Sequence, residues 1–206
     1  MTQPANADSY LEQHKTAVHA NPTCGMTRYN YAVALLAQKK FAEAEHELHE
    51  AVGFSPTFSE AYVLLGGIRM HQNDLEGCLL YNQKAVNARS NFAEGYGNIG
   101  FVHLQMGNIE AAIEALEKAV AINPNFIQAQ TNLGNAYLMN GQIDKSIETN
   151  KKVLEIEPAF AVAHNNLAIA YLEKGEPALA VTHCDKAELL GYEVAPEIKK
   201  EIDTYR

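Results

Sequence analysis

Two consecutive stretches of 34 residues decide the fold: AEGYGNIGFVHLQMGNIEAAIEALEKAVAINPNF at residues 93–126 and IQAQTNLGNAYLMNGQIDKSIETNKKVLEIEPAF at residues 127–160. In both stretches a proline near the end is followed two residues later by a phenylalanine. A fixed period of 34 residues is the signature of a helical repeat protein. The same proline recurs at Pro22, Pro56, Pro124 and Pro158.

The same period divides residues 25–194 into five units without a gap. The eighth place of each unit is Gly or Ala, which lets two helices approach closely. The fifteenth place is Gly or Asn in four units, and these residues tolerate the left-handed conformation at a helix C-terminus. Each unit is therefore predicted to be a helical hairpin, and in three of the five units a proline ends the second helix. The units are 25–58, 59–92, 93–126, 127–160 and 161–194.

These residues, in this order and at this period, resemble the tetratricopeptide repeat family over residues 25–194. The resemblance implies an all-α fold, a right-handed α-solenoid or superhelix of antiparallel helix pairs. First helices would line a concave groove, and second helices would form the convex back. We expect a short tail and a lone leading helix in residues 1–24, and a capping helix in residues 195–206. Ser9 and Glu12 form a capping box that predicts the start of the leading helix.

Seven residues depart from the family pattern, and two of them, Ser90 and Tyr192, replace the terminal proline. Lys39 replaces the turn Gly or Asn of the first unit, and Asn82 and Asn150 stand at the usually apolar twenty-fourth place. Arg28 and Arg69 occupy places that are normally aromatic. We expect the aliphatic stems of these two arginines to pack while each guanidinium reaches water.

Composition excludes several classes of protein. The 206 residues carry 16 basic against 25 acidic side chains, a net charge of −9, which is the wrong sign for binding nucleic acid. The longest wholly apolar run, residues 31–37, is far shorter than the roughly 20 residues of a membrane span. The first residues lack signal-peptide features, and an odd count of three cysteines fits a reducing compartment. We therefore expect a cytoplasmic protein without direct membrane insertion.

No residue pattern predicts catalysis, a metal site or a cofactor. His46 and His49 superficially resemble a zinc-protease motif, but their spacing is three residues where that motif needs four. Cys78 and Cys184 fill places that the repeat reserves for small or apolar residues, so we expect buried, inert thiols. The glycines serve turns and helix contacts, and none forms a phosphate-binding loop. We expect no enzyme activity.

The sixth place of the unit is the strongest candidate for binding. It lies about 200° around the helix from the eighth place, so it faces the groove if the eighth place faces the partner helix. An Asn amide there can accept from a peptide N–H and donate to a peptide C=O. This resembles the asparagine ladder of O-linked N-acetylglucosamine transferases, although the same residues could instead bond between neighbouring helices. The asparagines are Asn30, Asn98, Asn132 and Asn166, and Leu64 is the exception.

Other groove places add aromatic and amide residues but no Lys or Arg. We therefore predict a non-catalytic adaptor or scaffold that binds an extended, neutral or basic segment of another protein. The remaining candidate groove residues are Tyr29, Phe101, Gln128, Asn135 and Asn165.

A second hypothesis is self-assembly into a homo-oligomeric scaffold. The lone leading helix would dock into a neighbour's groove, as in a magnetosome-coating member of the family. The docking residues would be Tyr10, Leu11, Ala17 and Val18.

Overall fold

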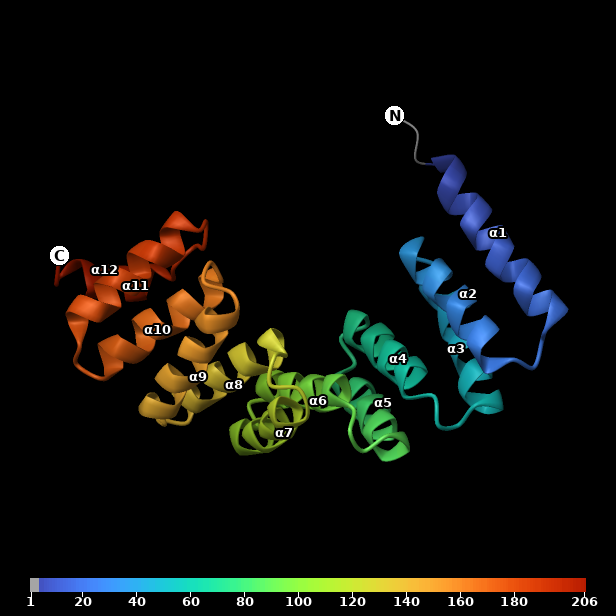
Figure 1. The fold of residues 1–206 in the computed structure, drawn as a ribbon, viewed down its shortest axis with the longest axis horizontal. Coiled ribbons are helices and arrows are strands. Elements are labelled where there is room, and N and C mark those ends of the chain that lie inside the picture. The colour runs from blue at the N-terminus through green and yellow to red at the C-terminus, as the bar shows by residue number, and fades with distance from the viewer. Residues whose placement is uncertain (1–3) are drawn as a thin grey trace. The chain divides into compact units, whose positions relative to one another are not determined.

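The computed structural model describes residues 4–206, with side chains from residue 9 onward. This part of the chain contains twelve α-helices and no β-strand, which confirms the all-α solenoid of helix pairs (Figure 1). The chain divides into two compact units, one ending at Gly95 and the other beginning at Tyr96. The helices are α1 (Pro4–Ala20), α2 (Gly25–Ala37), α3 (Phe41–Phe54), α4 (Ser59–His71), α5 (Leu75–Ala88), α6 (Ala93–Gln105), α7 (Ile109–Ile122), α8 (Ile127–Met139), α9 (Ile143–Ile156), α10 (Ala161–Glu173), α11 (Pro177–Leu189) and α12 (Pro196–Asp203).

In the N-terminal unit, α2 pairs with α3 and α4 pairs with α5, while α1 packs on α2. The core of these pairs contains Leu35, Leu48 and Leu65, each at most 1% exposed. Burial of such leucines removes apolar surface from water and is the main source of stability. Helix α1 begins at Pro4, so the predicted start at Ser9 is wrong. A proline suits the first helical position because its missing N–H has no partner there in any case.

Helix α1 already uses part of its apolar face within its own unit. Leu11 is 8% exposed and belongs to the core that includes Leu35, and Val18 is 9% exposed. Of the four residues proposed to dock into a neighbour, only Tyr10 is exposed, and half of its surface (50%) is accessible to solvent. Docking through α1 would therefore require Leu11 and Val18 to leave the contacts they have here.

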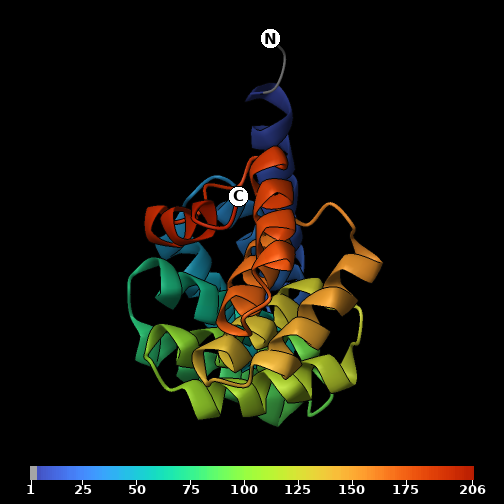
Figure 2. The same cartoon turned by 90° about the vertical axis from the view of Figure 1, so that its left-hand side faces the viewer.

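In the C-terminal unit, α8 pairs with α9 and α10 pairs with α11. Leu167 and Tyr171 from α10 form the core here with Val194 from the loop that follows α11. Helix α12 lies against α11 and runs in a different direction from it (Figure 2). Pro196 stands at the first turn of α12, and Ile202 is completely buried in the same core. The last helix thus covers apolar surface that the final pair would leave open.

The small eighth place gives the close helix contact that the sequence predicts. A Cβ added to Gly100 would lie 2.4 Å from Cγ of Leu116, and one added to Gly134 would lie 2.3 Å from Nδ2 of Asn150. Leu116 and Asn150 both occupy the twenty-fourth place, on the second helix of the same hairpin. The side chain at this place therefore fills the space that a larger eighth residue would need.

All five turns between the paired helices pass through a left-handed residue at the fifteenth place. This conformation is easy for Gly and tolerated by Asn, but it costs a side chain with a Cβ about 1 kcal/mol or more. Lys39 adopts it nevertheless, with φ of 59°. The backbone therefore keeps the family turn where the sequence departs from it. The other four are Asn73, Gly107, Gly141 and Gly175, with φ between 63° and 78°.

The two arginines at aromatic places are paired with acidic residues of α3, although both side chains keep some exposure, 13% for Arg28 and 27% for Arg69. The Arg28 side chain is 13% exposed, and its Nη1 donates to Glu47 Oε2 at 2.7 Å. Its Nε donates to the carbonyl of Pro22 at 2.7 Å. Arg69 donates through Nη2 to Glu45. Such charge-assisted bonds satisfy the guanidinium inside the repeat.

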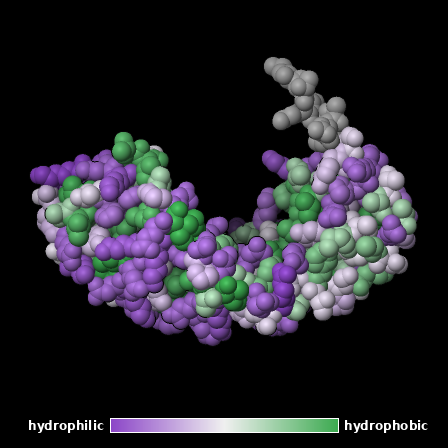
Figure 3. All heavy atoms as spheres, viewed as in Figure 1, coloured by the Kyte–Doolittle hydropathy of each residue, from purple (hydrophilic) through white to green (hydrophobic). Residues whose placement is uncertain are grey.

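On the face seen in Figure 3, hydrophilic side chains cover most of the C-terminal unit, with small hydrophobic patches between them. One exposed apolar side chain is Leu189 at the end of α11, which is 87% exposed. Within the described residues, no helix combines the length and the apolar character needed to cross a membrane.

Candidate functional site: an exposed stripe on the first helices

The first helix of a repeat has one narrow face that is accessible to solvent. In α8 this side consists of Gln128 and Met139, which are exposed, and Asn132 and Asn135, which are half-buried. Their spacings of four, three and four residues place them on successive turns of one helix face. The other residues of α8 from Ala129 to Tyr137 are buried. We call the second, sixth, ninth and thirteenth places of a repeat its outer stripe.

The outer stripes of the C-terminal unit adjoin one another. Helix α8 contacts α10, and Gly97 of α6 lies against the ring of Phe126 at the start of α8. These stripes are made of amide and apolar side chains and include no Lys or Arg. The charged residues in them are Glu173 and, at the second place of α6, the exposed Glu94. Beyond α8, the stripe residues are Glu94, Asn98, Phe101 and Gln105 on α6 and Val162, Asn166, Ile169 and Glu173 on α10.

The outer stripes of the N-terminal unit are more apolar. Met26 on α2 is 55% exposed, and Val33 further along the same face is 37% exposed. Asn30 stands between them and is half-buried. On α4 the sixth place is Leu64, and Glu60 is held at 2.8 Å by Arg89. The polar amides that characterise the C-terminal unit are therefore nearly absent here.

The fifth place of the repeat is packed, in contrast to the predicted open groove. The ring centroid of Tyr29 lies 4.7 Å from that of Phe58, and Asn165 is only 7% exposed. At the same place in α6, a Cβ on Gly97 would come within 2.9 Å of the Phe126 ring. In the repeats of Tyr29 and Gly97, the aromatic residue that ends the repeat covers the fifth place. Asn165 is therefore buried, whereas Tyr29 is half-buried beside the ring of Phe58.

The four sixth-place asparagines do not share one environment. Asn30, Asn98 and Asn132 are half-buried, whereas Asn166 is only 6% exposed. Asn166 Nδ2 donates to Oδ1 of Asn150 on α9 at 3.3 Å. The alternative role foreseen for these asparagines, a bond between neighbouring helices, is thus present at Asn166.

Asn150 is a residue whose role the repeat pattern did not reveal. It is completely buried at the twenty-fourth place, and its Nδ2 donates to the backbone oxygen of Ser146 at 2.9 Å. Its Oδ1 accepts from Asn166, so both ends of the amide are used. Burying an amide without such partners costs about 1–3 kcal/mol. The spacing in the sequence could have revealed this contact. Asn150 stands 16 residues before Asn166, whereas the residue 16 places before Asn132 is Leu116, which cannot form a hydrogen bond.

Comparison with known families agrees with this repeat geometry. A TPR repeat model matches residues 102–141, and two tetratricopeptide repeat models match residues 127–160 and 149–182. The match to residues 127–160 coincides with the fourth repeat unit. The chain is a tetratricopeptide repeat protein.

Solved structures of the same fold resemble this tetratricopeptide repeat protein over most of its length. YrrB, described as a TPR protein with an unusual peptide-binding site, is 20% identical with a TM-score of 0.77, covering 94% of this chain and 99% of that one. MamA is 27% identical with a TM-score of 0.70, covering 78% and 94%. Pseudomonas aeruginosa pilF is 14% identical with a TM-score of 0.82, covering 99% and 92%. No curated protein matches the sequence significantly.

Two histidines, His164 on α10 and His183 on α11, join the helices of the last repeat. His164 Nε2 lies 3.1 Å from the carbonyl oxygen of Pro158, and since a carbonyl only accepts, this nitrogen carries the proton. His164 Nδ1 lies 2.9 Å from His183 Nδ1, so one of these two nitrogens donates to the other. Burial lowers the pKa of His183 to about 4, and repulsion from His164, Lys186 and Lys151 acts in the same direction. The two histidines thus connect α10 to α11.

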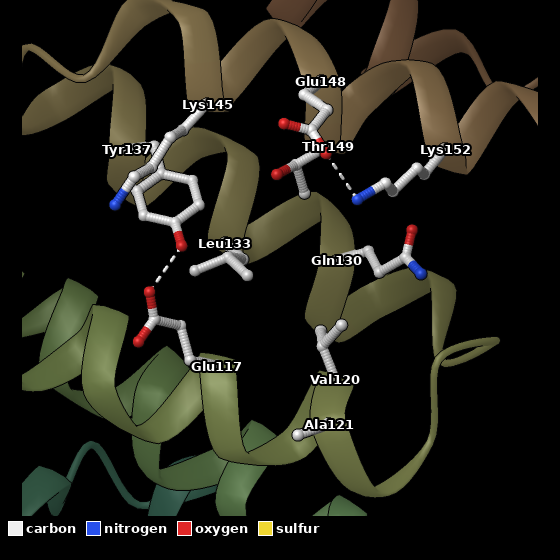
Figure 4. Close-up of a pocket in the computed structure, with 10 residues that line it drawn as sticks. All are labelled: Glu117, Val120, Ala121, Gln130, Leu133, Tyr137, Lys145, Glu148, Thr149 and Lys152. Atoms are coloured by element: carbon white, nitrogen blue, oxygen red, sulfur yellow. Dashed lines mark hydrogen bonds and ion pairs between the residues drawn. The ribbon is translucent and has the colours of Figure 1, made fainter.

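A pocket of about 380 Å³ opens on the second-helix side, between α7, α8 and α9 (Figure 4). The hydroxyl of Tyr137 points to Glu117 and donates to its Oε1 at 2.6 Å. Lys152 Nζ donates to Glu148 Oε1 at 2.7 Å. Burial and the Glu117 carboxylate raise the pKa of Tyr137. Tyr137 with Glu117 and Lys152 with Glu148 thus satisfy one another, whereas the buried Oε1 of Gln130 has no hydrogen-bond partner.

The side chains with chemical reactivity are dispersed over the repeats. His46 and His49 are both exposed on α3, and His49 Nε2 lies 3.7 Å from Glu45 Oε1. Cys78 and Cys184 are buried free thiols, as their repeat places predict. Across the described residues, no three His, Cys, Asp or Glu side chains come together as a metal-binding group.

Proposed function

We propose that this chain is a non-catalytic adaptor that holds an extended segment of a partner protein along the outer stripes of its first helices. The observation that carries the proposal is the stripe of the C-terminal unit. There, Gln128 is exposed and Asn132 and Asn135 are half-buried on one face, and the buried remainder of α8 fixes their positions. Amides on a well-packed helix can both donate to and accept from a peptide backbone, so they suit contacts to an extended chain. The cytoplasmic location expected from three free cysteines belongs to the same proposal.

The chemistry of the stripes indicates the kind of partner. They contain no cation to attract an acidic segment, and Glu94 on α6 and Glu173 on α10 add negative charge. We therefore assign a neutral or basic extended segment as the ligand. Phe101, Val162 and Ile169 stand between the amides and offer apolar contacts to its side chains. The peptide-binding site named for YrrB, a chain of the same fold, supports this assignment.

The affinity of such an interaction is bounded by its contacts. Neighbouring packed helices lie about 8–10 Å apart and an extended chain rises about 3.3 Å per residue, so each stripe meets roughly every third ligand residue. Each backbone hydrogen bond contributes about 0.5–1.5 kcal/mol net, and several kcal/mol are lost in ordering a flexible peptide. We expect affinity of about micromolar strength with little dependence on sequence.

The test uses the full-length chain and a displayed library of 12-residue peptides that lack charged side chains. Asn132→Ala should lower the binding affinity for peptides recovered from this library by at least threefold, and the helix content of the protein should not change. The matched control is Asn87→Ala, which removes the same side chain from an exposed position on the second helix α5. Recovery of no binder, or equal binding by both variants, would refute the proposed function.

A further inference from the structure

The amide of Asn166 is held in one orientation. Its Nδ2 donates to Asn150 Oδ1, and Asn150 cannot turn its own amide over without losing the 2.9 Å bond from its Nδ2 to Ser146 O. Reversal would also bring two like groups together, because Nδ2 of Asn150 would then face Nδ2 of Asn166. The bond to the Ser146 carbonyl therefore determines the orientation of both asparagines.

This orientation leaves the oxygen of Asn166 for a ligand. Among the buried side-chain atoms of the described chain, only His103 Nδ1 and Gln130 Oε1 lack a hydrogen-bond partner. Asn166 Oδ1 makes no bond within the described chain and is not one of these two atoms, so it retains contact with solvent. With Nδ2 turned towards α9, the group that Asn166 offers on the outer stripe is an acceptor.

The preceding repeat provides an internal contrast. The residue 16 places before Asn132 is Leu116, which cannot form a hydrogen bond and is completely buried against Gly100. Asn132 therefore has no counterpart of Asn150 to orient it, and it can present either end of its amide. Leu116 also shows that a leucine fits the twenty-fourth place opposite a glycine.

We propose that Asn150 is a positioning residue that makes Asn166 an obligatory acceptor, so that the bound segment must offer a backbone N–H at the residue lying over Asn166. A partner segment with proline at that residue is excluded, whereas the residue over Asn132 is not restricted in this way. This inference rests on the proposed function and adds a specificity rule to it. Asn150 itself stays buried and does not touch the ligand.

The first experiment tests the orientation through the variant Asn150→Leu, which gives the fourth repeat the same residue that the third repeat has at Leu116. Binding of a fluorescein-labelled 12-residue peptide from the uncharged library is measured by fluorescence anisotropy. We expect Asn150→Leu to weaken binding three- to tenfold in the wild-type background and by less than twofold in the Asn166→Ala background. A purely structural role would weaken binding equally in both backgrounds, and that result would overturn the proposal. NMR should also show that the Asn166 side-chain N–H protons exchange faster with water in Asn150→Leu.

The second experiment needs no change at Asn150. Each residue of the same peptide is replaced in turn by its N-methyl form, and binding is measured on the wild type and on Asn166→Ala. We expect one residue at which N-methylation costs at least tenfold on the wild type and less than threefold on Asn166→Ala. A scan with the same profile on both proteins overturns the inference but leaves the proposed function, provided that Asn132→Ala still weakens binding. If neither alanine variant weakens binding, both proposals fail.

Discussion

The closeness of the paired helices gives the sharpest test of the repeat register, through Gly134→Ala. The added Cβ would lie 2.3 Å from Nδ2 and 2.9 Å from Cγ of Asn150, well inside normal contact distance. Moving Asn150 away would break the bonds of its amide to Ser146 and Asn166. A substitution that usually favours a helix should therefore destabilise this one.

The magnitude follows from three contributions. Overpacking a tight contact costs about 1–3 kcal/mol. Displacing the Asn150 amide from its partners costs about 1–3 kcal/mol more, because the group is completely buried. Replacing a helical glycine by alanine stabilises the helix by about 1 kcal/mol, which offsets part of this loss. We therefore expect Gly134→Ala to lower the free energy of unfolding by about 1–5 kcal/mol, and Gly134→Leu or Gly100→Leu to lower it further.

The assay is urea unfolding followed by far-ultraviolet circular dichroism, with Gly67→Ala as the control. Gly67 is also helical, but a Cβ added to it would meet nothing within 4 Å. Gly67→Ala should therefore raise the free energy of unfolding by about 0.5–1 kcal/mol. If Gly134→Ala is as stable as Gly67→Ala, the helix contact deduced for the fourth repeat is wrong.

Three further predictions concern single side chains. Lys39→Gly should raise the free energy of unfolding by about 0.5–1 kcal/mol in urea, because it relieves a left-handed lysine; a loss of stability would contradict this. The pKa of His183 is about 4 in the folded chain against 6.5 as its ordinary value, so the unfolded chain binds more protons between these values. Stability should thus fall as the pH drops from about 6.5 to 4, and His183→Gln should flatten that slope; an unchanged slope would exclude His183 as its source. A thiol reagent should modify Cys24 alone in the folded chain and all three cysteines in urea, since Cys78 and Cys184 are buried, and rapid reaction of two thiols would refute this.

The repeat architecture could be predicted from the sequence because each local rule recurs with the same period. The fifteenth place is left-handed in all five repeats, and this includes Lys39, where the residue type gave no hint. Neighbouring repeats impose the hairpin geometry on a unit whose own turn residue is unfavourable. Periodicity thus carries information that a single residue does not.

The candidate site could be predicted only in part, because a place in a repeat does not specify what packs on it. Gln128 and Asn132 lie on the outer stripe as expected. Tyr29 is partly covered by Phe58, a residue 29 positions away in the sequence. Helix periodicity describes one helix at a time, whereas burial at the fifth place depends on an aromatic ring from the end of the repeat.

The buried Asn150 shows how such contacts can leave a trace in sequence after all. A completely buried amide is tolerated only where donors and acceptors meet both of its ends. One end is satisfied locally, by the carbonyl four residues earlier, and Asn82 makes the same bond to Cys78 at 2.9 Å. The second end requires a polar group from another helix, and for Asn150 this is Asn166, at the sixth place of the next repeat. An asparagine at the twenty-fourth place therefore predicts that the sixth-place residue of the next helix serves packing as well as any ligand. The recurrence of asparagine at the sixth place is thus weaker support for peptide binding than the exposed Gln128 of α8.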